Sequence, residues 1–306
     1  MVTSNFSRAV FVILIAILLF DFQGAIIKVL GDRYSVPQIA TFRNIFGLIP
    51  SLLILYFSQE WHARGRSFRL PGLRLALLRG VAIATAQFFF YWSITIMEFA
   101  TASTLAFAGP LFITALSIPI LRNHVGWVRW LAVIIGFVGI VLVMQPGRDI
   151  FETKALLPVI AALFYALTSV LVRLFDESAP TALINLYTTI AALACSTLLM
   201  FTLDAYQPIQ SFTDWLWMLA LGLVGGLAVF FLIVAYRLTQ PSNLSPFEYF
   251  GIPFSFAIGY IFFGEAPVET LLPGVFLIIG GGLLIVWRER QSHTSSVTQV
   301  KSRRRY

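Results

Sequence analysis

The sequence predicts an all-α integral membrane protein with ten transmembrane helices arranged as two inverted five-helix repeats. Three observations carry this prediction: the apolar composition, a succession of long apolar stretches, and proline positions that match between the two halves. Of the 306 residues, 58% are hydrophobic and only 11% are charged, whereas soluble domains have about 45–50% and about 25%. This composition excludes a soluble globular protein, a coiled coil and a disordered chain.

Hydropathy divides the chain into ten apolar stretches, each long enough to cross a hydrocarbon core about 30 Å thick. The backbone must satisfy its own hydrogen bonds inside a bilayer, so these stretches are expected to be helices. The longest connection, 58–73, is too short for an extramembrane domain. The first stretch is not a signal peptide, because no small-x-small cleavage site follows it. The expected spans are 9–30, 38–57, 74–97, 101–121, 127–145, 155–175, 181–203, 214–238, 243–263 and 268–287.

Positive charges favour one set of alternate connections, which predicts the orientation. Of the 21 Lys and Arg residues, 15 lie at the termini and in the even-numbered connections, and only four lie in the odd-numbered ones. Positive charge is retained on the cytoplasmic side, so both termini are expected in the cytoplasm. The last segment, 288–306, is expected to be a basic, disordered cytoplasmic tail that anchors the topology, with contact to anionic headgroups as the alternative.

The net charge of +7 therefore reflects topology, and no nucleic-acid partner is expected. The single cysteine, Cys195, lies in an apolar stretch, so no internal disulfide can form. The three histidines, His62, His124 and His293, fall in connections or the tail. Neither a metal site nor a cofactor is expected.

The two halves of the chain match when the sequence is shifted by 143 residues. This shift places Pro110 on Pro253 and maps the first five spans onto the last five. An odd number of spans in each half makes the two halves enter the membrane in opposite senses. Inverted repeats with proline-interrupted helices at matching positions point to a transporter site between the repeats. Pro110 and Pro253 are therefore candidate helix-bending residues, with a fixed structural kink as the alternative.

Two ionisable residues, Asp21 in the first span and Arg43 in the second, should both lie in the outer half of the membrane. A buried ionisable group costs about 2.5–3.5 kcal/mol or more in a membrane, so the two are expected to pair. The pair could simply hold the helices together, or it could line or gate a substrate path. Lys28, one heptad after Asp21, is interpreted as snorkelling to the interface.

Glu248 in the ninth span has no Lys or Arg three or four positions away. A desolvated carboxyl group can alternate between its protonated and ionised forms, as proton coupling requires. Glu248 is therefore a candidate for substrate or proton contact, with an ion pair to Arg237 or another helix as the alternative. Arg79 and Arg173 are interpreted as snorkelling anchors near the cytoplasmic ends of their spans.

Aromatic residues are dense in the third and ninth spans, around Gln87 and Tyr91 and around Tyr249. Aromatic faces suit planar or cationic ligands. Each of these three residues also has a polar group that needs a partner, so all three are candidate substrate contacts. Most of the 29 phenylalanines must nevertheless face lipid or pack between helices.

Catalytic and nucleotide-binding motifs are missing from the sequence. It contains no GxxxxGK[ST], HExxH or GxSxG pattern, so neither ATP-driven transport nor enzymatic activity is expected. A non-transporting membrane sensor or an intramembrane enzyme is the alternative to a transporter. A sensor would need an output domain, and an enzyme would need a convergent catalytic set.

Several local motifs resemble one family of membrane carriers. Ala40-Thr41-Phe42-Arg43, the Pro110 segment, the run from Val125 to Gly139 with Gln145-Pro146-Gly147 after it, and Phe263-Gly264-Glu265 look like the EamA family of the drug/metabolite transporter superfamily. The resemblance implies two repeats, 9–145 and 155–287, around a central cavity. It also implies a secondary carrier of the bacterial inner membrane. Phe20-Asp21 and Leu121-Arg122 depart from the usual Trp-Gly and Gly-Glu. Asp21, Lys28 and Arg43 together look more like the branch that takes up S-adenosylmethionine and riboflavin.

The expected function is therefore secondary transport of small organic metabolites by alternating access. The substrate would be an aromatic or cationic metabolite in an aromatic-lined cavity, with proton coupling as one option. The chain would act in the lipid bilayer as a monomer or a homodimer.

Overall fold

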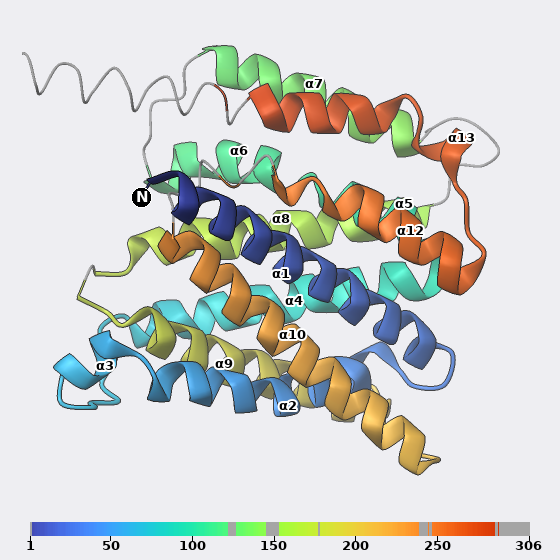
Figure 1. The fold of residues 1–306 in the computed structure, drawn as a ribbon. Coiled ribbons are helices and arrows are strands. Elements are labelled where there is room, and N and C mark those ends of the chain that lie inside the picture. Colours follow the sequence, from blue (N-terminus) through green and yellow to red (C-terminus); the bar gives the residue numbers. More distant parts are fainter. Residues whose placement is uncertain are drawn as a thin grey trace, which may run out of the picture.

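The structure is a computed structural model, and it describes residues 2–121, 127–144, 153–176, 178–238, 244, 247–284 and 287. These residues form an all-α bundle, and no strand occurs among them. Most of the long helices run side by side along one direction (Figure 1). The proposed tail, 288–306, lies outside the described residues.

The helices lie close to the predicted spans, but their ends differ and the fourth and ninth spans are interrupted by turns. Short helical segments are α3 (Gln59–Ala63), α13 (Val268–Leu271) and the two 3-10 turns Thr153–Ala155 and Val172–Leu174. The longer helices are α1 (Val2–Gly31), α2 (Val36–Tyr56), α4 (Leu73–Ile96), α5 (Phe99–Ala106), α6 (Gly109–Leu121), α7 (Trp127–Met144), α8 (Leu156–Leu171), α9 (Thr181–Thr202), α10 (Phe212–Leu238), α12 (Gly251–Phe263) and Gly274–Leu284.

Seven helical stretches of the described chain are long and apolar enough to cross a membrane. Three further apolar helices are shorter: Trp130–Val143, Gly251–Phe263 and Gly274–Leu284. They fall inside the fifth, ninth and tenth predicted spans. The structure thus supports a multi-pass membrane protein, and the number ten and the inverted arrangement stay predictions.

Local residue chemistry explains where two of the helices begin. Ser35 precedes α2, and its side chain accepts a hydrogen bond from Gln38 N at 3.3 Å. Pro37 lies in the first turn of α2, where its missing N–H costs nothing. Gly72 precedes α4 with a φ of 84°, a left-handed conformation that favours glycine.

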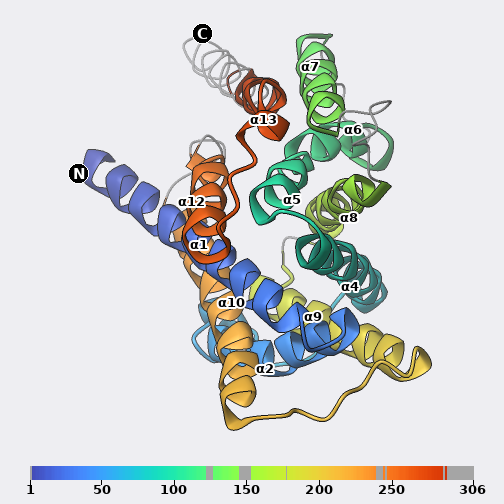
Figure 2. The ribbon, with the colours of Figure 1, turned by 90° about the vertical axis from the view of Figure 1, so that its right-hand side faces the viewer.

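Glycines allow the central helices to approach closely. Helix α1 packs along α10, α2 packs between α9 and α10, and α4 packs against α8 and α9 (Figure 2). A Cβ atom on Gly226 of α10 would collide with the Pro50 ring of α2, and one on Gly80 of α4 would collide with Ala191 of α9. Small residues at these crossings let the backbones meet, as in other membrane bundles.

Two of the apolar stretches are interrupted near matching positions. The fourth predicted span is broken into α5 and α6 by a turn at 107–108, just before Pro110. The ninth begins its main helix at Gly251, after a turn at 249–250 and just before Pro253. Pro110 and Pro253 therefore lie in the first turns of new helices rather than in the middle of continuous ones. Proline is tolerated in a first turn, where its missing N–H would have no helical partner. Whether they act in helix bending stays a prediction.

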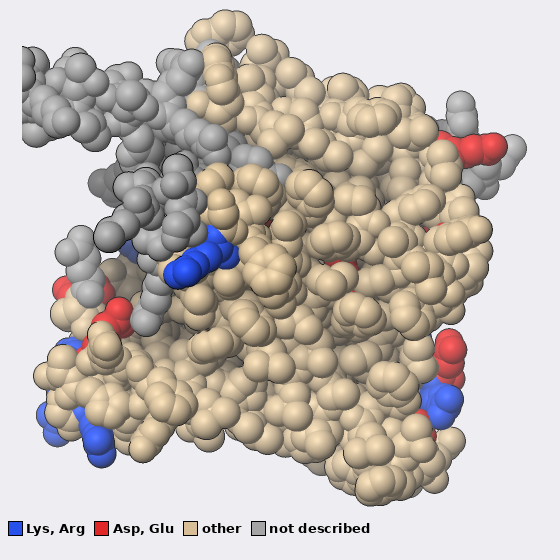
Figure 3. Space-filling model, in the orientation of Figure 1, with Lys and Arg blue, Asp and Glu red and all other residues tan. Residues whose placement is uncertain are grey.

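The surface has the distribution expected of a membrane protein. Figure 3 shows a broad uncharged face, with most of the Lys, Arg, Asp and Glu side chains gathered toward its two ends. Large apolar side chains such as Phe11, Trp127 and Phe276 are exposed on the surface of the bundle. An apolar exposed belt is stable only against lipid, because in water it would promote aggregation.

Candidate functional site

Buried polar side chains from four helices meet inside the bundle. Asn44 of α2 and Gln87 of α4 exchange hydrogen bonds: Asn44 Nδ2 donates to Gln87 Oε1 at 3.1 Å, and Gln87 Nε2 donates to Asn44 Oδ1 at 3.4 Å. Asn44 Nδ2 also donates to Ser196 Oγ of α9 at 3.4 Å. Gln23 Nε2 of α1 donates to the Tyr91 hydroxyl of α4 at 3.2 Å. All five side chains are buried.

Arg43 adds a positive charge to this group. Its Nη1 donates to Asn44 Oδ1 at 3.2 Å, and its buried Nε has no partner among the described residues. Gly225 of α10 makes room for it, because a Cβ there would lie 3.3 Å from Arg43 Nη2 and would collide with Gln23 Oε1. Tyr165 of α8 lies within electrostatic range of Arg43. We call Gln23, Arg43, Asn44, Gln87, Tyr91 and Ser196 the central cluster.

Asp21 lies apart from the central cluster. Its side chain is buried, and Oδ2 has no hydrogen-bond partner in the described part of the chain. The two ion pairs found among the described residues are Lys28–Glu265 and Arg33–Asp214, so the expected pair between Asp21 and Arg43 is wrong for this structure. Gln23 is the α1 residue beside Arg43, and Asp21, two positions earlier, lies on the opposite side of α1.

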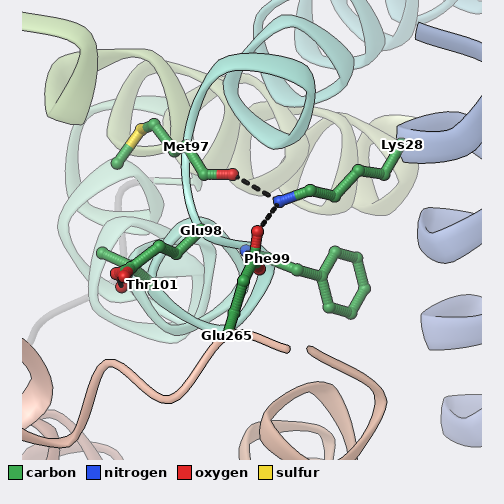
Figure 4. A network of polar contacts seen from close by, with 6 residues as sticks. All are labelled: Lys28, Met97, Glu98, Phe99, Thr101 and Glu265. Carbon is green, nitrogen blue, oxygen red and sulfur yellow. Dashed lines mark hydrogen bonds and ion pairs between the residues drawn. The ribbon is translucent and has the colours of Figure 1, made fainter. Parts of the chain in front are cut away.

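Lys28 does not snorkel to the interface as predicted. Its Nζ forms an ion pair with Glu265, which follows α12, and donates to Met97 O at 2.8 Å (Figure 4). The other carboxylate oxygen of Glu265 accepts from Phe99 N, at the start of α5, at 2.7 Å. Glu265 thus caps α5 and binds the cation of α1. Lys28 stays inside the bundle because the Glu265 carboxylate neutralises its charge more effectively than interfacial water does.

Arg79 is also tied down rather than anchored at an interface. Its Nε donates to Thr168 O of α8 at 3.1 Å, and its Nη1 donates to Thr188 Oγ1 of α9 at 3.0 Å. The interpretation as a snorkelling anchor is wrong for Arg79, because two neighbouring helices offer oxygen acceptors along its length. The side chain of Arg237 lies outside the described residues.

Glu248 and Tyr249, the candidate residues of the ninth span, lie outside the central cluster. Glu248 is half-buried in the helical turn before α12. The Tyr249 ring packs 5.9 Å from the Phe107 ring, centroid to centroid, and its buried hydroxyl lies against Gly282, where a Cβ would collide with it. Of the predicted substrate residues, the structure therefore groups Arg43, Gln87 and Tyr91, and it separates Asp21, Glu248 and Tyr249 from them.

The connection after α1 and the first turn of α2 are fastened to the first turn of α10 and the connection before it. Asp214 Oδ1 accepts from Arg33 Nη1 at 2.8 Å, and its Oδ2 accepts from the Tyr34 hydroxyl at 2.9 Å. Burial raises the pKa of the Tyr34 phenol above its usual value, because the charged form would lose its hydration. Gln38 is bonded twice to the Gln207 backbone, at 2.7 and 2.9 Å. We call this set, with Lys28 and Glu265, the Lys28 end.

Sequence reasoning missed Gln23, Asn44 and Ser196. These are uncharged polar residues inside apolar spans, so hydropathy does not single them out. Gln23 is two residues from Asp21, and Asn44 is adjacent to Arg43. Their buried amide groups are a signal that could have been read, because a buried amide needs hydrogen-bond partners.

The single cysteine lines a groove of about 290 Å³ between α2, α4 and α9. Cys195 is half-buried there, and the adjacent Ser196 of the central cluster also lines the groove. The other lining residues are mostly apolar: Pro37, Ala40, Val81, Ala84, Thr85, Phe88 and Leu199.

Known proteins resemble this chain along most of its length. The S-adenosylmethionine uptake transporter of Rickettsia prowazekii (strain Madrid E) is 26% identical over 269 residues, which are 88% of each chain. The riboflavin transporter of Brucella anthropi is 26% identical over 261 residues, covering 84% of this chain and 90% of its own. The riboflavin transporter of Vibrio cholerae serotype O1 is 29% identical over 191 residues, 61% of this chain and 63% of its own.

A solved crystal structure has the same fold. It superimposes with a TM-score of 0.62 at 20% sequence identity and covers 91% of this chain and 97% of its own. Among protein families, the EamA-like transporter family matches residues 7–145 and 153–287. These two stretches are nearly the whole chain, and they include the central cluster and the Lys28 end. The chain belongs to the EamA-like transporter family and is a transporter rather than an enzyme.

Proposed function

We propose that the protein is a secondary transporter of small organic metabolites, and that the central cluster is its substrate site. One observation carries this proposal: the half-buried Arg43, with its Nε fully buried, lies beside a set of buried amide and hydroxyl groups inside an apolar bundle. Burying such groups is costly, and ionisable residues within membrane bundles are usually functional. Among the described residues no acid pairs with Arg43, so its charge is available to an anionic or electron-rich part of a substrate.

The substrate class follows from the hydrogen-bonding groups of the central cluster. Gln23, Gln87 and Asn44 offer both donors and acceptors, and the Tyr91 and Tyr165 rings offer faces for stacking. A planar heteroaromatic metabolite with hydrogen-bond donors and acceptors on its edge matches this chemistry. Relatives are named as transporters of S-adenosylmethionine and of riboflavin, and both compounds contain such a ring. These two are therefore the first candidates.

Alternating exposure of the two halves would move the substrate. The central cluster joins α1, α2 and α4 of the first half to α9 of the second. The interruptions at 107–108 and 249–250 support a mechanism in which α6 and α12 change their angles. We further propose that the two repeats are inverted, that the cavity between them is lined by aromatic residues, and that both termini face the cytoplasm of a bacterial inner membrane.

The test uses the purified full-length protein in liposomes loaded with a mixture of S-adenosylmethionine, riboflavin and aromatic amino acids. Selective loss of one compound from vesicles with protein, and not from empty vesicles, is the expected result. Arg43→Gln should lose most of this transport. Its matched control is Arg33→Gln, because Arg33 is a half-exposed arginine outside the central cluster. If no compound moves in either direction in folded protein, with or without a pH gradient, the proposed function is wrong.

Glu248→Gln separates proton coupling from binding. If Glu248 carries the coupled proton, this variant should still bind the substrate but should lose the dependence of its transport rate on a pH gradient. Rates that keep the wild-type dependence on the gradient would remove Glu248 from the coupling step.

A further inference from the structure

A second set of buried polar atoms lies on the other side of α1 from Gln23. Asp21 Oδ2, Ser103 Oγ and Thr104 Oγ1 are all buried, and none has a hydrogen-bond partner in the part of the chain that the structure describes. The three residues are 9%, 4% and 0% exposed. Leaving buried polar atoms without partners costs about 1–3 kcal/mol each, and more for a charged group. Three such atoms on neighbouring helices indicate a missing partner.

The face of α1 that carries Asp21 is turned toward α5 and α12. Ile17, Asp21 and Gly24 recur every three or four residues, so they share one face of the helix. A Cβ on Gly24 would lie 2.7 Å from the Phe99 ring of α5. A Cβ on Gly251 of α12 would lie 3.2 Å from Ile17. Asp21 lies between these two contacts.

Ser103 of α5 lies at the same level as Asp21. Phe99 is opposite Gly24, and Phe107, two turns later, meets Gly251 beside Ile17. Helix α5 therefore runs antiparallel to α1, and Ser103 falls midway between the two phenylalanines. It is also one turn from Phe99 and thus on the face of α5 that is turned toward α1. Thr104 is the next residue.

Other charged groups near this position are already engaged or lie farther away. Lys28 is two turns from Asp21 on the same helix and is paired with Glu265. Glu98, before α5, is exposed and accepts from Thr101 Oγ1 at 3.1 Å. Arg43 forms no ion pair with Asp21 in the described chain. The Asp21 carboxylate is thus left without a neutralising cation.

The donor set consists only of oxygen atoms, one of them a carboxylate. Oxygen ligands of this kind are those that hard cations prefer, at about 2.3–2.6 Å for an ion of the size of Ca²⁺. A cation bound between these helices would supply the partner that Asp21 Oδ2, Ser103 Oγ and Thr104 Oγ1 lack.

We propose that Asp21 and Ser103, with Thr104 beside them, form a binding site for a monovalent cation. A single negative charge from the protein matches a single positive charge. The cation has two possible sources: Na⁺ from solution, or the positively charged group of a substrate such as S-adenosylmethionine. The burial of the site and its separation from the central cluster by the body of α1 favour Na⁺ as a coupling ion. The coupling role rests on the proposed function, whereas binding itself does not.

Binding is measured first on the full chain in detergent, by thermal unfolding in NaCl and in choline chloride at equal ionic strength. A ligand that binds the folded state raises the unfolding temperature, so NaCl should stabilise the wild type more than choline chloride does. Asp21→Asn and Ser103→Ala should each raise the NaCl concentration for half of this effect by about tenfold or more. Asp32→Asn is the matched control, because Asp32 is an exposed aspartate beyond the end of α1, and it should behave as the wild type.

A second arm identifies the source of the cation. The same unfolding measurement is made with S-adenosylmethionine and with S-adenosylhomocysteine, which lacks the sulfonium charge. If the substrate supplies the cation, Asp21→Asn should abolish the preference for the charged compound, and Na⁺ should have no specific effect. If Na⁺ supplies it, the preference should be unchanged.

The cation site is refuted if wild-type protein responds to neither cation, or if Asp21→Asn and Ser103→Ala both fold and respond as the wild type does. Ser103→Ala keeps the test decisive if Asp21→Asn does not fold. Failure of the proposed function gives a different pattern, because no metabolite would then cross the liposome membrane in any variant, whatever the unfolding data show.

Discussion

The Lys28 end and the middle of the bundle contain similar polar residues but satisfy them differently. At the Lys28 end, Lys28 pairs with Glu265 and Arg33 pairs with Asp214. The middle of the bundle also contains an acidic and a basic residue, Asp21 and Arg43. Each of these has a buried polar atom without a partner among the described residues. The pairs at the Lys28 end can be explained by folding alone, whereas the unpaired groups in the middle cannot.

This difference indicates which polar residues can gain free energy by binding a ligand. A charge that is neutralised within the protein gains nothing more from a ligand. A buried charge without a partner has already lost its hydration, so a ligand that supplies the partner recovers that cost. The following predictions test whether the middle serves binding and the Lys28 end serves stability.

The largest effect is expected for Arg43. Arg43→Gln should lower the rate of substrate transport by about 100-fold, because a charge-assisted contact in a low-dielectric site is worth several kcal/mol. Arg43→Lys should recover only part of the rate, since lysine lacks the planar fork of guanidinium. Initial rates in liposomes at equal protein content measure this. Wild-type rates for Arg43→Gln would show that the unpaired charge in the middle does not serve transport.

The next largest effect is expected for Glu265. Glu265→Gln should lower the free energy of unfolding by about 1–3 kcal/mol, because Lys28 is left partly buried without its counter-charge. A double-mutant cycle with Lys28→Met, followed by denaturant unfolding in detergent micelles, measures the coupling between the two residues. Additive effects would contradict a stabilising pair.

A smaller effect is expected for the neutral part of the central cluster. Gln87→Ala should weaken the apparent substrate affinity by about three- to tenfold, since it removes one neutral hydrogen-bonding group. Thr85→Ala is the matched control on the same helix, because the Thr85 hydroxyl donates to Val81 O within α4 at 3.0 Å and bonds no cluster residue. Concentration-dependent transport separates affinity from maximal rate. Equal affinities in the two variants would place the substrate elsewhere.

The smallest effect is expected for Arg33. The side chain of Arg33 is 52% exposed, so its ion pair with Asp214 is screened by solvent. The Asp214 side chain is buried but keeps the Tyr34 hydroxyl as a partner, so loss of Arg33 should cost about 1 kcal/mol, the upper end for exposed pairs. Arg33→Ala should therefore change the unfolding temperature by only a few degrees and leave transport unchanged. A transport defect in this variant would mean that the Lys28 end moves during the cycle.

The sequence predicted most of the helices but few of the contacts between them. Hydropathy placed the second and third spans at 38–57 and 74–97, and the helices are 36–56 and 73–96, because burial in lipid determines helix length directly. Pro110 and Pro253 marked the fourth and ninth spans as interrupted. Hydropathy did not show that the chain turns just before them, at 107–108 and 249–250, since apolarity continues across both turns.

The candidate site was predicted only in part, for a different reason. Hydropathy gives the depth of Asp21 and Arg43 but not the direction in which each faces, so their pairing was inferred wrongly. The partner of Lys28 is 237 residues away along the chain, and no rule of local spacing connects them. Gln87 and Tyr91 were identified because both need partners inside an apolar span, which is a local property.

The position of Cys195 makes the natural chain ready for spectroscopy. It is the single cysteine of the protein, and it is half-buried in the groove that α9 forms with α2 and α4. A thiol-reactive fluorophore would therefore attach at one defined position, and no other cysteine has to be replaced first. Its neighbour Ser196 is bonded to Asn44 across the boundary between the halves. If the two halves separate as proposed, the emission of that dye would change as Ser196 and Asn44 move apart.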